Sequence, residues 1–233
     1  MTKIAICYWG MTRSTKLVYQ THIQNVFNVL TNNHIEYDTY MHTWETENNA
    51  NIVWEKDCKI PVDYEEYKLL SPTVYKLEKQ NDFLGTIQFD KYYYEGEFEW
   101  IPQLIINHLC ALESQKRVYR MVIESGIQYD YIIFIRPDVY VCNPINFNFI
   151  GHNFDIIIPN TDHNEGYNDR FAIIPFLKAK KYATRIDEIA EFRKQNGRIV
   201  SEKYVKYIIN KYYPNLVMND LIMKIIRPNG VIA

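Results

Sequence analysis

The sequence predicts an α/β fold in which a mixed, mostly parallel β-sheet is flanked by helices. An apolar strand at 3–8 leads through a glycine turn into a helical pattern and then into a second strand at 35–44. Apolar residues recur at helical intervals over 99–125, and this stretch leads directly into an apolar strand at 131–135. Strands that alternate with helices are typical of parallel sheets, because parallel neighbours need a crossover connection. The length of 233 residues and the 47% hydrophobic composition favour a single domain over 1–233, with two small domains as the alternative.

Local signals predict the remaining elements in chain order. The stretch 62–70 favours a short helix, which a Ser-Pro pair ends, and 73–78 has the pattern of a strand. Gly126 is typical of the end of the long helix, and Ser201 is typical of a helix N-cap. The other expected elements are strands at 139–141, 154–158 and 171–175, helices at 177–195 and 202–212, and one or two closing strands within 215–230.

The composition argues against several classes of partner. The formal net charge of −2 provides no broad basic field, so we expect no nucleic-acid partner. No apolar run approaches the roughly 20 residues that a membrane-spanning helix needs, and the first residues lack a secretory pattern. We therefore expect a soluble protein of the cytoplasm without a membrane span. Widely spaced cysteines without a C-x-x-C pair favour reduced thiols over a zinc site or a disulfide framework.

The first strand ends in the segment CYWGMTRS, which contains Gly10 and Arg13. A strand that leads through a glycine into a helix places backbone N–H groups and a cation at the helix N-terminus, where a phosphate can bind. The segment is neither a G-x-G-x-x-G nor a Walker A motif, so it supports neither a dinucleotide site nor an ATPase loop. A tight turn with a solvent-exposed arginine is an equally supported alternative.

A second polar motif, IRPDV, ends the apolar strand at 131–135 and contains Arg136 and Asp138. Pro137 breaks the strand where Asp138 turns out of the sheet. A carboxylate at the carboxyl edge of a parallel sheet can hold a divalent cation, which neutralises the diphosphate that leaves an activated donor. An Arg-Asp ion pair that ends the strand without any function is the alternative.

This motif with its flanks, YDYIIFIRPDVYV, resembles the D-x-D strand of nucleotide-sugar glycosyltransferases with the GT-A fold. The similarity is to an R-x-D variant of bacterial and large-virus families. Other segments match in the same order: KIAICYWGMTRS with its G-x-x-R turn, YDTYMHTW, GYNDRFAIIP, SEKYVKYIINKY and IIRPNG. The resemblance touches nearly the whole chain and implies a GT-A-like, Rossmann-like fold. It also implies transfer of a hexose from a UDP- or GDP-sugar donor to a hydroxyl of a glycan or glycoprotein acceptor.

The resemblance implies roles for the residues that match. Gly10 and Arg13 would line the nucleotide or diphosphate pocket. Asp138 would be the carboxylate that binds Mn²⁺ or Mg²⁺, whereas Arg136 stands in place of the first acid of the D-x-D motif. An arginine at this position would contact the diphosphate directly and would weaken the requirement for a metal ion.

Four further candidates come from other segments. In GYNDRF, Asp169 and Arg170 would face the donor sugar or the acceptor, and Asp169 is the candidate general base for the acceptor hydroxyl. A loop held together by ion pairs is the alternative. On the long helix, Arg117 is a candidate contact for the donor, although a solvated charged face explains it as well. His42, at the end of the second strand, is the histidine best placed to reach a site at that edge.

Two other functions stay open from the sequence. A non-catalytic nucleotide- or glycan-binding module on the same fold is favoured by the arginine at position 136. A metal-dependent nuclease or phosphatase would need clustered carboxylates, and the strand end offers a single one, Asp138. Glycosyl transfer is therefore the function that the sequence favours.

Overall fold

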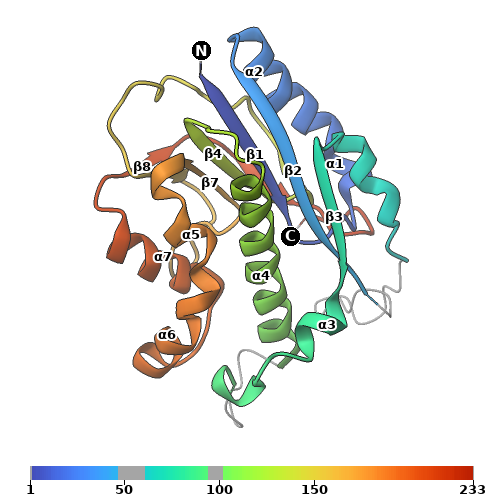
Figure 1. Cartoon of the computed structure of the whole chain (residues 1–233), viewed down its shortest axis with the longest axis vertical. Helices are drawn as coiled ribbons and strands as arrows, with labels where there is room; N and C mark the ends of the chain where they lie inside the picture. Colours follow the sequence, from blue (N-terminus) through green and yellow to red (C-terminus); the bar gives the residue numbers. More distant parts are fainter. Residues whose placement is uncertain (1, 47–60, 94–101, 233) are drawn as a thin grey trace.

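The computed structural model describes residues 2–46, 61–93 and 102–232 (Figure 1). Within these ranges, seven strands form one sheet in the order β3-β2-β1-β4-β7-β6-β8. These strands are β1 (Lys3–Trp9), β2 (Glu36–Glu45), β3 (Val74–Lys79), β4 (Tyr131–Ile135), β6 (Ile156–Pro159), β7 (Phe171–Pro175) and β8 (Leu216–Asn219). The predicted mixed, mostly parallel sheet is confirmed.

In this sheet, β7 runs against its neighbours. The strands β1 to β4 pair in parallel, and so do β6 and β8, whereas β7 is antiparallel to both β4 and β6. Phe171, the first residue of β7, pairs with Ile135, the last residue of β4. The segment before β7 therefore lies at the carboxyl edge of the parallel strands, which is where ligands bind in open α/β sheets.

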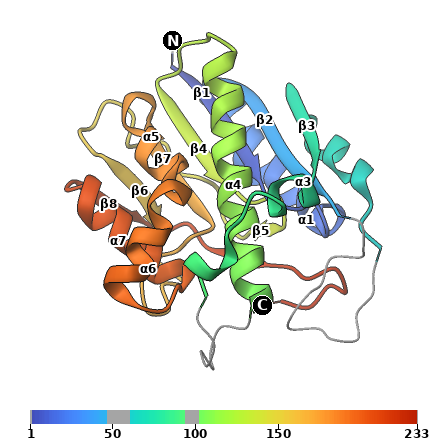
Figure 2. The same cartoon turned by 60° about the horizontal axis from the view of Figure 1, so that its bottom comes forward.

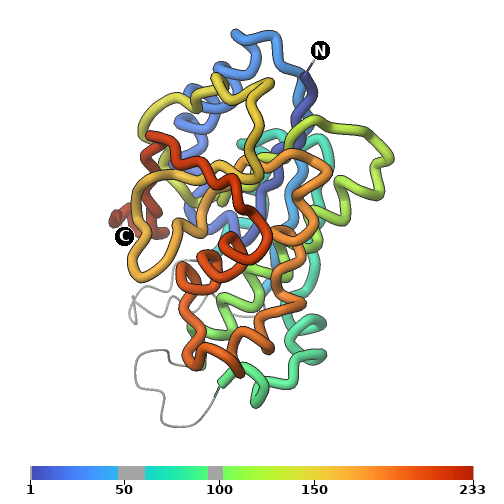
Figure 3. Tube along the Cα trace, turned by 90° about the vertical axis from the view of Figure 1, so that its left-hand side faces the viewer, coloured from blue at the N-terminus to red at the C-terminus, as the bar shows by residue number. Residues whose placement is uncertain are grey.

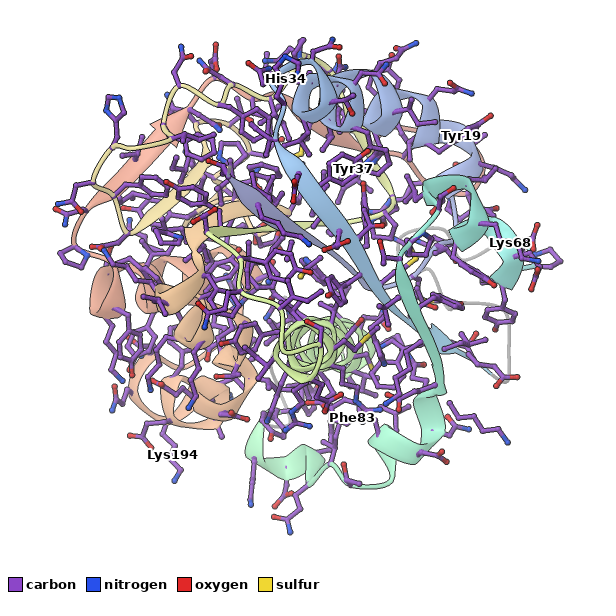
Figure 4. The ribbon with its side chains drawn as sticks, turned by 45° about the horizontal axis from the view of Figure 1, so that its top comes forward. Tyr19, His34, Tyr37, Lys68, Phe83 and Lys194 are labelled. Atoms are coloured by element: carbon purple, nitrogen blue, oxygen red, sulfur yellow. The ribbon has the colours of Figure 1, made fainter. Side chains whose placement is uncertain are left out.

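Helices cover both faces of the sheet (Figures 1 and 2). One face carries α1 (Thr15–His22), the π-helical segment η1 (Ile23–Phe27) and α2 (Asn28–Asn32), and the other carries α4 (Pro102–Glu124), α5 (Lys180–Ala183), α6 (Ile189–Asn196) and α7 (Ser201–Tyr212). Successive residues of β1 point to opposite faces, so Cys7 packs on the α4 side and Ile6 on the α2 side. In Figure 4, Phe83 lies on the α4 side of the sheet and Tyr37 lies on the α2 side.

The C-terminal part of the chain, red in Figure 3, returns from α7 to the end of β4. There β9 (Met223–Ile225) pairs antiparallel with β5 (Val139–Val141) in a separate two-stranded sheet. The N–H of Ile226 donates to the carbonyl oxygen of Asp138 at 3.1 Å. The hydroxyl of Ser14, just before α1, donates to the carbonyl oxygen of Ile226 at 2.7 Å. The expected closing strands are thus present as β8 and β9, and β9 supports the strand-end motif.

The prediction of one continuous helix over 177–195 is wrong. The structure breaks this stretch into η4 (Phe176–Lys178), α5, η5 (Arg185–Glu188) and α6. Thr184, with φ −100° and ψ 22°, lies outside the α-helical region and ends α5, and the 3₁₀ turn η5 separates it from α6. These breaks turn Arg185 into the interior, where it is 1% exposed.

The other predicted helices are present with small differences. The helix predicted at 99–125 is α4, although 99–101 lie outside the described residues. Gly126 follows α4 with φ +68°, as expected of a helix C-terminus. The stretch 62–70 forms a 3₁₀ helix, η2 (Tyr64–Leu70), and β3 follows it as expected. Two short helices were not expected from the sequence: α3 (Gln80–Leu84) and η3 (Phe89–Lys91).

Ser201 is not the N-cap of α7. It is the first residue of the helix, Val200 stands at the N-cap position, and the Ser201 hydroxyl donates to the side chain of Glu202 at 2.7 Å. Among the helices in the described ranges, none has both the length and the apolar character needed to cross a membrane.

Candidate active site

A cleft of about 900 Å³ opens at the carboxyl edge of the parallel strands. Its walls come from the turn after β1, the end of β4, the loop before β7, the first half of α4 and the start of α7. Six of the residues expected from the sequence line this cleft: Gly10, Arg13, Arg136, Asp138, Asp169 and Arg170. The antiparallel direction of β7 brings the last two to the edge where the other four lie.

Asp138 is the centre of a buried ion cluster. Arg136 donates to it twice, from Nε to Oδ1 at 2.8 Å and from Nη2 to Oδ2 at 2.6 Å, and Arg13 donates from Nη2 to Oδ2 at 3.2 Å. Asp138 is 1% exposed. Burial by itself would raise the pKa of Asp138, but the two guanidinium groups more than offset this effect and hold the pKa well below its usual range. Guanidinium groups bind carboxylate and phosphate oxygens through charge-assisted hydrogen bonds, and two of them meet at this strand end.

Arg136 is positioned by contacts with two further groups. Its guanidinium carbon lies 5.7 Å from the centre of the Trp9 ring, and its backbone N–H donates to the carbonyl oxygen of Arg170 at 3.3 Å. Burial would lower the pKa of Arg136, but Asp138 raises it above its usual range, so the side chain stays charged. Trp9 lines the cleft, and its buried Nε1 has no hydrogen-bond partner among the described residues. A polar ligand in the cleft can accept from this N–H.

The turn after β1 is tied to α4. Gly10 has φ +99°, a conformation that glycine adopts without strain, and its N–H donates to the Ser114 hydroxyl oxygen at 2.9 Å. The N–H of Gly10 therefore positions the turn instead of meeting a phosphate. Arg13, three residues later, supplies the cation that the sequence predicted at this place.

His42 belongs to a polar network behind the cleft and does not line it. Burial lowers the pKa of His42 to about 4, although Glu78 opposes this effect, so the ring is neutral at pH 7. In the neutral ring, Nε2–H donates to Glu78 at 2.9 Å. Nδ1 lies 2.8 Å from the Ser114 hydroxyl oxygen, and this hydroxyl donates to the backbone carbonyl oxygen of His42 at 2.9 Å. His42 thus acts on the site through Ser114 and the Gly10 turn.

Arg117, the expected donor contact on the long helix, also lies outside the cleft wall. Its Nε donates to Glu113 at 2.9 Å, and its Nη1 pairs with Glu78. Its guanidinium carbon lies 4.7 Å from the centre of the Trp44 ring. Because Trp44 lines the cleft and Arg117 does not, Arg117 supports the wall from behind.

The loop before β7 holds Arg170 and leaves Asp169 available. Arg170 Nη1 pairs with Asp162 Oδ2 at 2.9 Å, and the backbone N–H of Arg170 donates to Asn168 Oδ1 at 2.9 Å. The Asn168 side chain is buried and donates to the carbonyl oxygen of Thr161 at 3.0 Å. Asp169 is half-buried, and within the described ranges it makes no hydrogen bond or ion pair. The ion-paired loop that the sequence left open therefore applies to Arg170 and not to Asp169.

Sequence reasoning missed four charged residues of the cleft, Glu165, Arg185, Glu202 and Arg227, of which Arg185 is buried. For Arg185 the reason is visible in the pattern. In the sequence it lies between Tyr182 and Ile189 in a stretch with helical spacing, where an arginine has the pattern of a solvated helix face. The breaks on either side of η5 direct it inward, and no signal in a single sequence indicates such breaks.

The described residues do not fit a divalent cation at Asp138. Both carboxylate oxygens already accept hydrogen bonds from guanidinium groups, and Mn²⁺ or Mg²⁺ needs several oxygen ligands. Across residues 2–46, 61–93 and 102–232, no group of three or more His, Cys, Asp or Glu side chains could hold a metal ion. At this strand end the positive charge comes from Arg13 and Arg136.

No protein-family model matches the chain, and no curated protein matches its sequence. Among solved structures, the chain is similar to the galactosyltransferase LgtC in complex with donor and acceptor sugar analogs, with a TM-score of 0.44, 8% identity, and coverage of 93% of this chain and 73% of that one. It is also similar to a glycosyltransferase involved in glycosylation of the major capsid of PBCV-1, with a TM-score of 0.43, 10% identity, and coverage of 94% and 82%. The glycosyltransferase GlyE of Streptococcus pneumoniae TIGR4 has a TM-score of 0.43 and 8% identity, with 94% of this chain and 45% of that chain covered.

Proposed function

We propose that the protein is a glycosyltransferase that moves a hexose from a UDP- or GDP-sugar to a hydroxyl of a glycan or glycoprotein. The observation that carries the proposal is the cluster of Arg13, Arg136 and Asp138 at the end of β4, inside a cleft of about 900 Å³. The motif of this cluster resembles the D-x-D element of GT-A transferases. The volume of the cleft lies within the roughly 300–1,000 Å³ that small-molecule sites occupy.

Arg13 and Arg136 are the proposed ligands of the donor diphosphate. Guanidinium groups bind phosphate oxygens through charge-assisted hydrogen bonds, and both arginines line the cleft at the end of β4. Trp9 adds an unused N–H on the same wall. Negative charge develops on the leaving diphosphate in the transition state, and the two guanidinium groups are already in place to stabilise it. Such preorganised electrostatic stabilisation is usually the largest single contribution to catalysis.

Asp169 is the proposed base for the acceptor. In the transfer, the acceptor oxygen bonds to the anomeric carbon while the bond from that carbon to the diphosphate oxygen breaks, and its electron pair leaves with the nucleoside diphosphate. The proton of the acceptor hydroxyl passes to the Asp169 carboxylate. This carboxylate can accept a proton because no hydrogen bond or ion pair within the described ranges occupies it.

The proposed donor site works without a metal ion at Asp138. The arginines supply the positive charge there, so the chelator EDTA should leave donor binding unchanged. The binding test is a thermal-shift screen of the purified protein against UDP, GDP and their sugars, with Mn²⁺, with Mg²⁺ and with EDTA. One nucleotide should raise the melting temperature equally in all three conditions, since a ligand that binds the folded state stabilises it.

Two variants make the binding test specific. Arg13→Gln should lose the nucleotide shift, whereas Arg120→Met should keep it, because Arg120 is exposed on α4 and does not line the cleft. A shift that needs Mn²⁺ would remove the arginines from their assigned role. No shift with any nucleotide would contradict the proposed donor.

Turnover separates the enzyme from a non-catalytic binding module. Release of UDP or GDP from the bound donor should be measurable in the presence of glycan acceptors. Asp169→Asn should lower this rate by about 10²- to 10⁴-fold, the usual contribution of a general base, and should leave nucleotide binding unchanged. Tight binding without turnover, for every acceptor and with water, would favour the module instead.

A further inference from the structure

Arg185 is a buried cation without a carboxylate partner. It begins η5, lines the cleft and is 1% exposed. Its Nη1 donates to the carbonyl oxygen of Tyr182 at 2.9 Å, and its guanidinium carbon lies 4.2 Å from the centre of the Tyr182 ring. Its buried Nε makes no hydrogen bond with any described residue, and no described carboxylate pairs with it.

Three other arginines of the cleft each have a carboxylate partner, which Arg185 lacks among the described residues. Arg13 and Arg136 share Asp138, and Arg170 pairs with Asp162. For Arg185, the neighbouring Tyr182 cannot supply a negative charge, because burial raises the pKa of its hydroxyl. A buried charge without compensation is costly, and an anionic ligand in the cleft would remove that cost.

The position of Arg185 is fixed by the core. The hydroxyl of Tyr204, on α7, donates to the backbone carbonyl oxygen of Arg185. The Tyr182 ring beneath the guanidinium is fully buried and lies 5.6 Å from the Phe134 ring of β4, measured between ring centres. A cation held in this way loses little conformational entropy when it binds a ligand, which is how a preorganised site gains affinity.

Arg185 acts on the same part of the cleft as the proposed acceptor base. Burial lowers the pKa of His108 to about 4, Asp169 opposes this effect, and Arg185 and Arg136 lower the pKa further. All four residues line the cleft. An anion bound at Arg185 would therefore lie in the chamber that also holds Asp169.

We propose that Arg185 forms a second anion-binding subsite, which takes a carboxylate or phosphate group of a substrate other than the donor diphosphate. The substrate class is then an acidic sugar or a phosphorylated sugar. This inference rests on the proposed function in one respect, because that function assigns Arg13 and Arg136 to the diphosphate and leaves Arg185 for a different group.

The test uses the whole protein and two simple anions, glucuronate and inorganic phosphate, at constant ionic strength. The readout is the shift in melting temperature over a concentration series, with glucose and chloride as neutral and ionic controls. At least one anion should stabilise the protein, and Arg185→Met should weaken its binding about 10- to 100-fold, as expected when a charge-assisted hydrogen bond is lost. A response to glucuronate alone identifies an acidic sugar, and a response to phosphate alone identifies a phosphorylated one.

Further variants decide where the anion binds. Because phosphate also fits the Arg13–Arg136 cluster, phosphate binding is compared between the single variant Arg136→Gln and the double variant Arg136→Gln with Arg185→Met. Arg120→Met, the control on the exposed face of α4, should keep the full anion response. An anion response that survives Arg185→Met, or one that Arg136→Gln abolishes by itself, would overturn the subsite, and so would the lack of any response in the native protein.

The ligand-free stability of Arg185→Met separates a binding role from a structural one. Arg185→Met removes a buried charge that no described carboxylate pairs with, which offsets the loss of its hydrogen bond to the Tyr182 carbonyl oxygen, so this variant should melt close to the native temperature. A lower melting temperature would contradict the claim that the charge is uncompensated. Arg185→Met should also keep the nucleotide shift. Anion binding at Arg185 without any nucleotide binding would refute the proposed donor and leave the subsite standing.

Discussion

Arg136 and Asp138, two residues apart at the end of β4, form a two-point ion pair, with Nε to Oδ1 at 2.8 Å and Nη2 to Oδ2 at 2.6 Å. The intervening Pro137 lets both side chains face the same space, and Arg13 joins them from the turn after β1. Two guanidinium groups thus meet a single carboxylate at the end of β4. Under the proposed function, these guanidinium groups would bind the donor diphosphate in place of a metal ion.

Removal of Asp138 should destabilise the fold. Asp138→Ala leaves Arg13 and Arg136 close together without their carboxylate, so we expect the free energy of unfolding to fall by about 3–5 kcal/mol. Urea denaturation at neutral pH measures this change. The double variant Arg136→Met with Asp138→Leu should recover part of the loss, because the buried pair is then absent as a whole. A single variant within about 0.5 kcal/mol of the native protein would contradict the role of the cluster.

Acidification should destabilise the protein well before its carboxylates are protonated. Burial lowers the pKa of His22, His42 and His108 to about 4, whereas the unfolded chain binds these protons near pH 6.5. Stability from these groups is therefore complete above about pH 6.5 and is lost as the pH falls toward about 4, by up to about 1.4 kcal/mol per pH unit for each histidine.

His22 provides the control for this pH dependence. Its Nε2 donates to the carbonyl oxygen of Val139 at 2.7 Å, and its Nδ1 accepts from the Tyr8 hydroxyl at 3.1 Å. His22→Gln keeps a donor for Val139 and removes the titrating group. Urea denaturation at several pH values between about 7 and 4.5 should show a shallower slope for this variant. Equal slopes would mean that His22 is not buried in its neutral form.

Gly166 should be intolerant of a side chain. A Cβ at this position would lie 1.9 Å from the carbonyl oxygen of Glu202 and 2.4 Å from the backbone nitrogen of Lys203, at the start of α7. Gly166→Ala would push the loop before β7 away from α7, with an expected loss of about 1–3 kcal/mol in stability and a loss of turnover as Asp169 moves. Thermal unfolding and a transfer assay measure the two effects. Gly85→Ala is the matched control, since its nearest Cβ contact is 3.4 Å.

Ser114 should couple the Gly10 turn to the core. Ser114→Ala leaves the N–H of Gly10 and Nδ1 of His42 without their hydroxyl partner, at an expected cost of about 1–3 kcal/mol. The same change should weaken nucleotide binding, because Arg13 follows this turn. Denaturation and nucleotide titration test both effects. Ser125→Ala, at the far end of α4 and outside the cleft, should leave nucleotide affinity unchanged.

The predicted strands and helices agree with the structure where the sequence signal is local. The strands β1, β2, β4 and β7 and the long helix α4 were expected close to their observed bounds, because their apolar spacing reflects burial on one or both faces. The helix over 177–195 was mispredicted, since apolar spacing continues across the break at Thr184 and the 3₁₀ turn η5 and does not record backbone angles. Ser201 failed as an N-cap because its hydroxyl bonds to Glu202 instead.

The sequence by itself determined which residues stand at the strand ends, because a charge after a buried strand must lie at the edge of the sheet. Gly10, Arg13, Arg136 and Asp138 could be found in this way. Tertiary structure decided which of these charges meet, and it brought Asp169 to the same edge through the antiparallel direction of β7. It also decided that Arg117 faces Glu113 and Glu78 while Arg185 faces the cleft. The physical reason is that an ion pair or an unpaired buried charge depends on distances between distant segments, and a single sequence carries no record of those distances.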